Sequence, residues 1–214
     1  MFIEKPCKEF LDDLAAKKSV PGGGGAAAFT GALAAALTSM VCNFTVDKKG
    51  YEESHNEIKK MLKEAEDIRN QLVDLIEADA QAFSELMAVY KMPKNTEEEK
   101  NSRAHTLQEK AKKAADVPMK IAALSLLVQE LALKAQQKGN RDLESDAILS
   151  GIMGRAALKS AYYNVIINLK IINDYSYKQK HLTLLNEMLE KGGKLEQEIM
   201  QAGEKNFTLQ QINN

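Results

Sequence analysis

Residues 19–46 form a continuous run without a charged side chain, and this run restricts what the chain can fold into. A helix of this length could span a bilayer. The segment, however, is rich in alanine and also contains threonine, serine and asparagine, which gain little in lipid. We therefore predict that it forms a helix buried in a water-soluble protein and not a membrane span.

The same run carries small residues at helical spacing. Ala28, Ala32 and Ala36 recur every four positions and share one face of a helix. A face this thin lets another helix approach closely. It is typical either of a protein core or of a dimer interface.

The rest of the chain has a strong helical period. Between Glu52 and Tyr90, apolar residues recur every three or four positions, which predicts a helix of roughly 58 Å. Alanine supplies 27 of the 214 residues, whereas the 12 glycines and 4 prolines are too few for a loop-rich or all-β fold. The predicted fold class is all-α.

Capping residues and helix breakers divide this pattern. A short amphipathic helix is predicted over residues 6–17. After a break at 92–95, Thr96 and Glu99 form a capping box that begins a new helix. Pro118 is expected to kink or divide that helix.

Two further helices are predicted over residues 141–174 and 178–206, the second interrupted at Gly192–Gly193. The chain then forms one domain, residues 1–214. We expect a bundle of six or seven helices, several of them long, that pairs as a two-fold homodimer.

Charge and cysteine content limit the partners and the compartment. With 29 Lys and Arg against 30 Asp and Glu, no basic field is available for nucleic acid. Cys7 and Cys42 lack a metal-ligand or redox spacing, and the first residues do not form a signal peptide, which indicates the reducing cytoplasm. His55, His105 and His181 are scattered, so no metal site is predicted.

Four consecutive glycines, Gly22 to Gly25, precede the uncharged helix. With the alanines that follow, they match the dinucleotide pattern GxGxxA, but that pattern needs a preceding β-strand and residues 10–18 are predicted to be helical. Two interpretations stay open: a flexible turn, or a backbone surface that a ligand approaches closely. Free N–H groups at a helix N-terminus would suit an anionic or carbonyl oxygen.

Asp79 is the most informative acidic residue. It falls on the apolar face of the long helix, together with Ile76 and Phe83. A carboxylate at such a position is paired with a base, or lies in a cleft with a raised pKa, or bridges structurally to a neighbouring helix. The pattern alone does not choose among these.

Asn164 and Asn168 stack on one face of an otherwise apolar helix. Such amides need hydrogen bonds, either to neighbouring helices or to a heterocyclic ligand. Asp146 lies five turns earlier on the same face but about 27 Å away, so it could share a small-molecule site with Asn164 only across a dimer. Lys94, in the loop after the long helix, could receive a ligand carboxylate, although solvated loop lysines are more common.

Taken together, these segments resemble the formiminotransferase-cyclodeaminase family, which includes stand-alone bacterial methenyltetrahydrofolate cyclohydrolases. The resemblance runs from about Cys7 to the last helix, with its blocks in the expected order. The blocks are residues 19–24, residues 79–83 followed by 91–94, and residues 161–169; Ser145-Asp146 is also similar to a family acid.

The resemblance implies an all-helical dimer that binds a folate, with Asp79 as the catalytic aspartate. The substrate-binding positions that it implies are Pro21, Gly22, Gly23, Gly24, Phe83, Lys94, Asp146, Asn164 and Asn168. Gly25 departs from the pattern, because a small residue such as serine is expected there. One hydroxyl contact would therefore be missing.

Both reactions of the family are acid–base chemistry on a one-carbon bridge and require no cofactor or metal. A cyclohydrolase hydrolyses methenyltetrahydrofolate to formyltetrahydrofolate, whereas a cyclodeaminase closes a formimino group onto the second folate nitrogen and releases ammonia. We expect the chain to stand alone, without a fused formiminotransferase domain, and on this expectation we favour the cyclohydrolase, with the cyclodeaminase as the alternative. An alternative of another class is a non-catalytic helical interaction protein.

Overall fold

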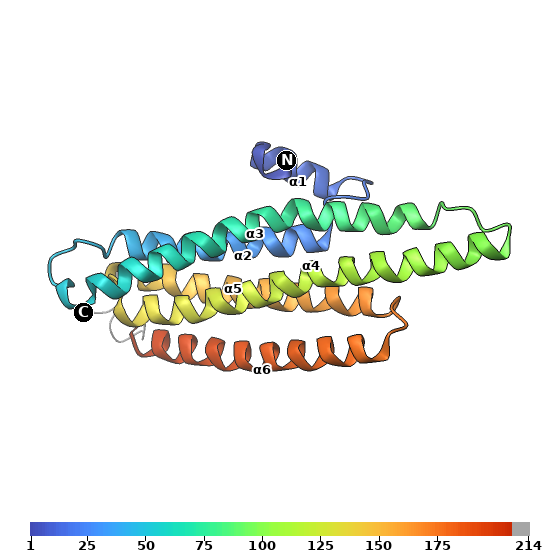
Figure 1. Ribbon diagram of the computed structural model, residues 1–214. Helices are drawn as coiled ribbons and strands as arrows, with labels where there is room; N and C mark the ends of the chain where they lie inside the picture. Colours follow the sequence, from blue (N-terminus) through green and yellow to red (C-terminus); the bar gives the residue numbers. More distant parts are fainter. Residues whose placement is uncertain (207–214) are drawn as a thin grey trace.

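The computed structural model describes residues 1–206, which fold into helices joined by short connections (Figure 1). This part of the chain contains no β-strand, and the prediction of an all-α fold is confirmed. The last positions of the predicted domain, 207–214, lie outside the described residues. The α-helices are α1 (Cys7–Ala15), α2 (Gly23–Asn43), α3 (His55–Val89), α4 (Glu97–Lys138), α5 (Glu144–Leu169) and α6 (Tyr175–Asn206), and short 3-10 helices cover Phe2–Glu4, Glu52–Ser54 and Arg141–Leu143.

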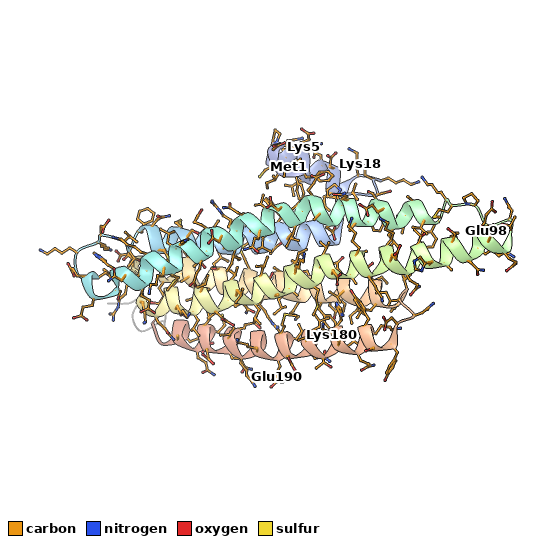
Figure 2. The ribbon with its side chains drawn as sticks, viewed as in Figure 1. Met1, Lys5, Lys18, Glu98, Lys180 and Glu190 are labelled. Carbon is orange, nitrogen blue, oxygen red and sulfur yellow. The ribbon has the colours of Figure 1, made fainter. Side chains whose placement is uncertain are left out.

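Helices α2 to α5 form the centre of the bundle. Helices α2 and α4 each pack against both α3 and α5, so the four helices close a ring. Helix α6 runs along the outer side of α4 and α5, and α1 lies at the opposite edge of the molecule (Figure 1). Charged side chains such as Glu98 and Glu190 lie at the periphery (Figure 2).

The apolar stripe predicted between Glu52 and Tyr90 forms the buried face of α3. Ile58, Leu72, Ile76 and Leu86 are all at most 1% exposed. Burial of a side chain of this size contributes roughly 1.5–3 kcal/mol. The long α3 is therefore held mainly by the helices against which this face packs.

Helix α2 is long and apolar enough to cross a membrane, yet 61% of its most apolar 18-residue stretch is buried inside the bundle. Ala28 and Ala32 are buried in the core, and Ala36, the third residue of the thin face, is half-buried. At Gly31 the backbone comes close to a neighbouring helix, and a Cβ there would lie 3.2 Å from Leu72. The thin face of α2 is thus used for packing within the chain, as predicted for a buried helix.

Neither α4 nor α6 is divided at the residues where the sequence suggested a break. Helix α4 is continuous through Pro118, and α6 is continuous through Gly192 and Gly193. Gly192 is a contact residue and not a break, because a Cβ at this position would lie 2.6 Å from Leu158 and 2.7 Å from Gln129. The capping box that begins α4 is present, as predicted.

Candidate active site

A cleft of about 360 Å³ opens at the N-terminus of α2, where α3, α4 and α5 also contribute side chains. Its size falls in the range of small-molecule sites. It brings together the glycine run, Asp79 and both asparagines, which the sequence places far apart. The lining residues are Ser19, Val20, Gly22, Gly23, Gly24, Asp79, Phe83, Leu86, Met87, Ala114, Asn164, Ile167, Asn168 and Ile171.

The glycine run is the first turn of α2 and not a loop before it. Gly22 is the N-cap residue and offers no capping side chain. The N–H of Gly25 donates instead to Oδ2 of Asp79 at 3.1 Å, so a residue of α3 caps α2. The N–H groups of Gly23 and Gly24 have no acceptor among residues 1–206 and are available to a ligand oxygen.

Gly24 permits this arrangement because it has no side chain. An added Cβ would fall on the carboxylate of Asp79. At Gly23, an added Cβ would lie 3.3 Å from Oδ1 of Asn164, a tight contact. The backbone of α2 can therefore approach α3 and α5 this closely only where these positions are glycine.

Asp79 is half-buried, and no lysine, arginine or histidine of residues 1–206 forms an ion pair with it. Burial raises the pKa of its carboxyl group, and the hydrogen bond from Gly25 opposes that shift in part. Of the sequence interpretations, the pairing with a base is wrong. Asp79 combines the other two, because it lies in a cleft and also bridges to a neighbouring helix.

The two asparagines use their amide N–H groups within the protein. Nδ2 of Asn164 donates to the carbonyl oxygen of Ser160 at 2.9 Å. Nδ2 of Asn168 donates to the carbonyl oxygens of Asn164 and Ala114, each at 2.9 Å. The side-chain oxygen of Asn168 has no donor among the described residues and remains free at the cleft.

The apolar walls were largely missed in the sequence. Phe83, 37% exposed, was predicted at the site, but Leu86 and Met87 look like ordinary core positions of α3. Ile167 and Ile171 follow the asparagines at helical spacing, a signal that could have found them. These side chains form surfaces suited to a flat heterocycle.

Three predicted site residues do not line the cleft. Pro21 is buried behind the glycine run, with its Cβ 3.6 Å from the position of a Cβ on Gly25. Lys94 is exposed in the connection between α3 and α4. Asp146 lies in the first turn of the unbroken α5, about 27 Å along the helix from Asn164. The unbroken α5 keeps Asp146 away from the cleft of its own chain.

None of the three histidines lines the cleft, and two of them contact acidic side chains. His181 contacts the carboxylate of Asp116 at 3.2 Å, and His105 lies 3.5 Å from Glu109. Within residues 1–206, no three His, Cys, Asp or Glu side chains gather as metal ligands. The polar groups of the cleft are the carboxylate of Asp79, the amides of Asn164 and Asn168, the hydroxyl of Ser19 and backbone N–H groups.

Comparison with known proteins gives one consistent result. Residues 6–187 match the family model described as formiminotransferase-cyclodeaminase. The chain is 42% identical over 190 residues to a methenyltetrahydrofolate cyclohydrolase of Methylorubrum extorquens, covering 89% of this chain and 91% of that protein. It is 33% identical to the formimidoyltransferase-cyclodeaminase of Rattus norvegicus, of which it spans 35%.

A solved structure is also similar over nearly its full length. It is the formiminotetrahydrofolate cyclodeaminase of Thermotoga maritima, with a TM-score of 0.85 and 33% sequence identity. The match covers 94% of this chain and 97% of that one. Both the fold and the sequence thus point to the same group of proteins.

Proposed function

The chain belongs to the formiminotransferase-cyclodeaminase family, and on this premise we propose that it is a folate enzyme that hydrolyses methenyltetrahydrofolate to formyltetrahydrofolate. The observation that supports this most is the carboxylate of Asp79, half-buried in a cleft and bound only by a backbone N–H among the described residues. A non-catalytic interaction protein has no need for such a group.

Asp79 is the proposed acid–base residue. Its carboxylate takes a proton from the water that adds to the electrophilic methenyl carbon. It then returns a proton to the bridge nitrogen as the carbon–nitrogen bond of the tetrahedral adduct breaks, while the hydroxyl group of the adduct loses its proton to solvent and becomes the formyl carbonyl. A carboxyl group whose pKa is raised by burial suits both steps, because it holds and releases a proton closer to neutral pH.

The rest of the cleft supports substrate binding. Phe83 and Ile167 provide apolar faces for the pterin ring, and the free oxygen of Asn168 accepts from one of its N–H groups. The N–H groups of Gly23 and Gly24 are placed to hold a carbonyl oxygen of the ligand. This binding requires no cofactor beyond the folate substrate.

The choice between the two reactions rests on the relatives. The cyclohydrolase of Methylorubrum extorquens shares 42% identity, whereas the rat formimidoyltransferase-cyclodeaminase and the Thermotoga maritima cyclodeaminase each share 33%. We therefore favour hydrolysis of the methenyl substrate. Cyclodeaminase action on formiminotetrahydrofolate is the second candidate, because the same aspartate serves either reaction.

We also propose a homodimer formed through the outer faces of α2 and α5. These helices lie side by side, and α2 carries no charged residue. Their outward side chains include large apolar groups: Leu33, Leu149, Ile152, Tyr163 and Ile167. An apolar surface this extended is typical of an interface, and Ile167 belongs to both this surface and the cleft.

The cytoplasm is the proposed compartment. Cys7 and Cys42 are both free thiols, and Cys42 is buried where a partner cannot reach it. Unpaired cysteines are usual in a reducing environment. A folate substrate and a second copy of the chain are the partners that this proposal includes; nucleic acid and membranes are not among them.

A paired assay tests the proposed function. The purified protein is given methenyltetrahydrofolate and formiminotetrahydrofolate at matched concentrations, and kcat/KM is compared for loss of methenyl absorbance and for ammonia release. We expect the methenyl substrate to have the higher value. A much higher value for ammonia release would reverse the choice. If the protein converts neither substrate and binds no folate by calorimetry, the proposal that it is a folate enzyme is refuted.

A further inference from the structure

Pro118 lies inside α4, four residues after Ala114, and is buried. Proline has no backbone N–H, so the carbonyl oxygen of Ala114 lacks the donor that residue 118 would otherwise supply in the helix, and the proline ring crowds that carbonyl. This carbonyl is instead the acceptor for Nδ2 of Asn168 at 2.9 Å. The acceptor that proline frees in α4 is thus used by a side chain of the cleft.

The orientation of the Asn168 amide follows from this contact. Its second N–H donates to the carbonyl oxygen of Asn164, also at 2.9 Å. If the amide were turned over, its oxygen would face two carbonyl oxygens, an arrangement with no hydrogen bond. The two carbonyls therefore fix the nitrogen toward the protein and leave the side-chain oxygen of Asn168 at the cleft as an acceptor.

We propose that Pro118 is a positioning residue for substrate recognition. By freeing the Ala114 carbonyl, it anchors Asn168 so that the cleft offers an oxygen acceptor, which selects ligands with an N–H donor at this point. Proline is the least favourable residue inside a helix, and this role explains its position in α4. The identification of that ligand as the pterin ring of a folate rests on the proposed function, whereas the anchoring itself does not.

The first test uses the protein without ligand. Pro118→Ala restores the N–H that competes for the Ala114 carbonyl, and alanine favours the helix. The side-chain amide signals of Asn168, assigned by their absence in Asn168→Ala, are expected to shift in the 1H–15N spectrum of Pro118→Ala. Pro6→Ala, at an exposed proline outside the cleft, is the matched control and is expected to leave them unchanged. Unchanged Asn168 signals in Pro118→Ala would overturn the proposal.

The second test separates positioning from folding. Pro118→Ala is expected to raise KM for methenyltetrahydrofolate about two- to tenfold, the effect of one neutral hydrogen bond, with kcat nearly unchanged and Tm not lowered. In a protein that already carries Asn168→Ala, Pro118→Ala is expected to cause no further increase in KM. Equal effects of Pro118→Ala in both backgrounds would contradict a role through Asn168. If the wild-type protein neither binds nor converts a folate, the proposed function fails, and the amide signals still decide the anchoring.

Discussion

The backbone of Gly24 lies so close to the side chain of Asp79 that a Cβ on residue 24 would clash with the carboxylate atoms. These residues belong to α2 and α3. The contact fixes how deeply the first turn of α2 enters the cleft. It also lets the N–H of Gly25, one residue later, bond to Asp79 at 3.1 Å.

Gly24→Ala is therefore expected to inactivate the enzyme by displacing Asp79. Because the carboxylate must rotate away, we expect kcat to fall at least tenfold while the helix content stays constant. Gly193→Ala is the matched control, since a Cβ there makes only an ordinary contact with Arg155. Steady-state kinetics and circular dichroism of both variants check this. Full activity of Gly24→Ala would show that the position of Asp79 is not critical.

Two substitutions of Asp79 distinguish catalysis from capping. Asp79→Asn keeps an oxygen that accepts from Gly25 but cannot exchange a proton, so kcat is expected to fall 10²–10⁴-fold, on the order of a general acid–base effect, with Tm preserved. Asp79→Ala removes the cap as well and is expected to lower Tm in addition. Turnover by Asp79→Asn at the wild-type rate would exclude Asp79 as the acid–base residue.

The raised pKa of Asp79 also predicts how stability varies with pH. Because the folded pKa lies above the unfolded value, folding favours the protonated acid. The resulting stabilisation is complete below the unfolded pKa and is lost as pH rises through the folded pKa. Relative to Asp79→Asn, the wild-type protein should lose stability over this window. Denaturant unfolding of both proteins at a series of pH values measures it, and parallel curves would contradict the raised pKa.

Glu85 shows the opposite behaviour. Lys113 and Lys110 of α4 lower the pKa of this α3 carboxyl group to about 2. The stabilisation that ionised Glu85 gives the folded state is fully present above the ordinary glutamate pKa of 4.5 and is lost as pH falls through about 2. Glu85→Gln should thus lower Tm at pH 7 and lose this effect toward pH 2. Glu98→Gln, at an exposed position, is the control. Equal Tm changes for Glu85→Gln and Glu98→Gln at pH 7 would argue against a stabilising ion pair between Glu85 and the two lysines.

The proposed dimer predicts a face-specific effect of charge. Leu149→Lys places an ammonium group on the outer face of α5, where Leu149 is 44% exposed, and should yield monomers. Leu184→Lys makes the same change on α6 at 42% exposure and should leave the dimer intact. Sedimentation at micromolar concentration checks this. A wild-type monomer, or equal behaviour of the two variants, would count against an interface formed by α2 and α5.

The local part of the fold was accessible without the structure. Helix positions follow from apolar periodicity and capping, which depend on residues three or four apart, so α3 and the capping box at Thr96 and Glu99 were predicted. Pro118 was expected to kink or divide its helix, and Gly192–Gly193 to interrupt theirs, but neither helix is divided. Pro118 and Gly192 are tolerated because buried packing against neighbouring helices outweighs their low helix propensity.

The sequence by itself determined that the chain is helical, that residues 19–46 are largely buried, and that the glycine run, Asp79 and the asparagines are unusual for a bundle. Only the tertiary structure decided which of these residues meet. Asp79 and Gly25 are 54 positions apart, as are Asn168 and Ala114, and no local pattern specifies such contacts. The structure also decided that Lys94, in the loop after α3, does not line the cleft, whereas the separation of about 27 Å between Asp146 and Asn164 already followed from the sequence, because the rise per residue of an unbroken helix fixes it.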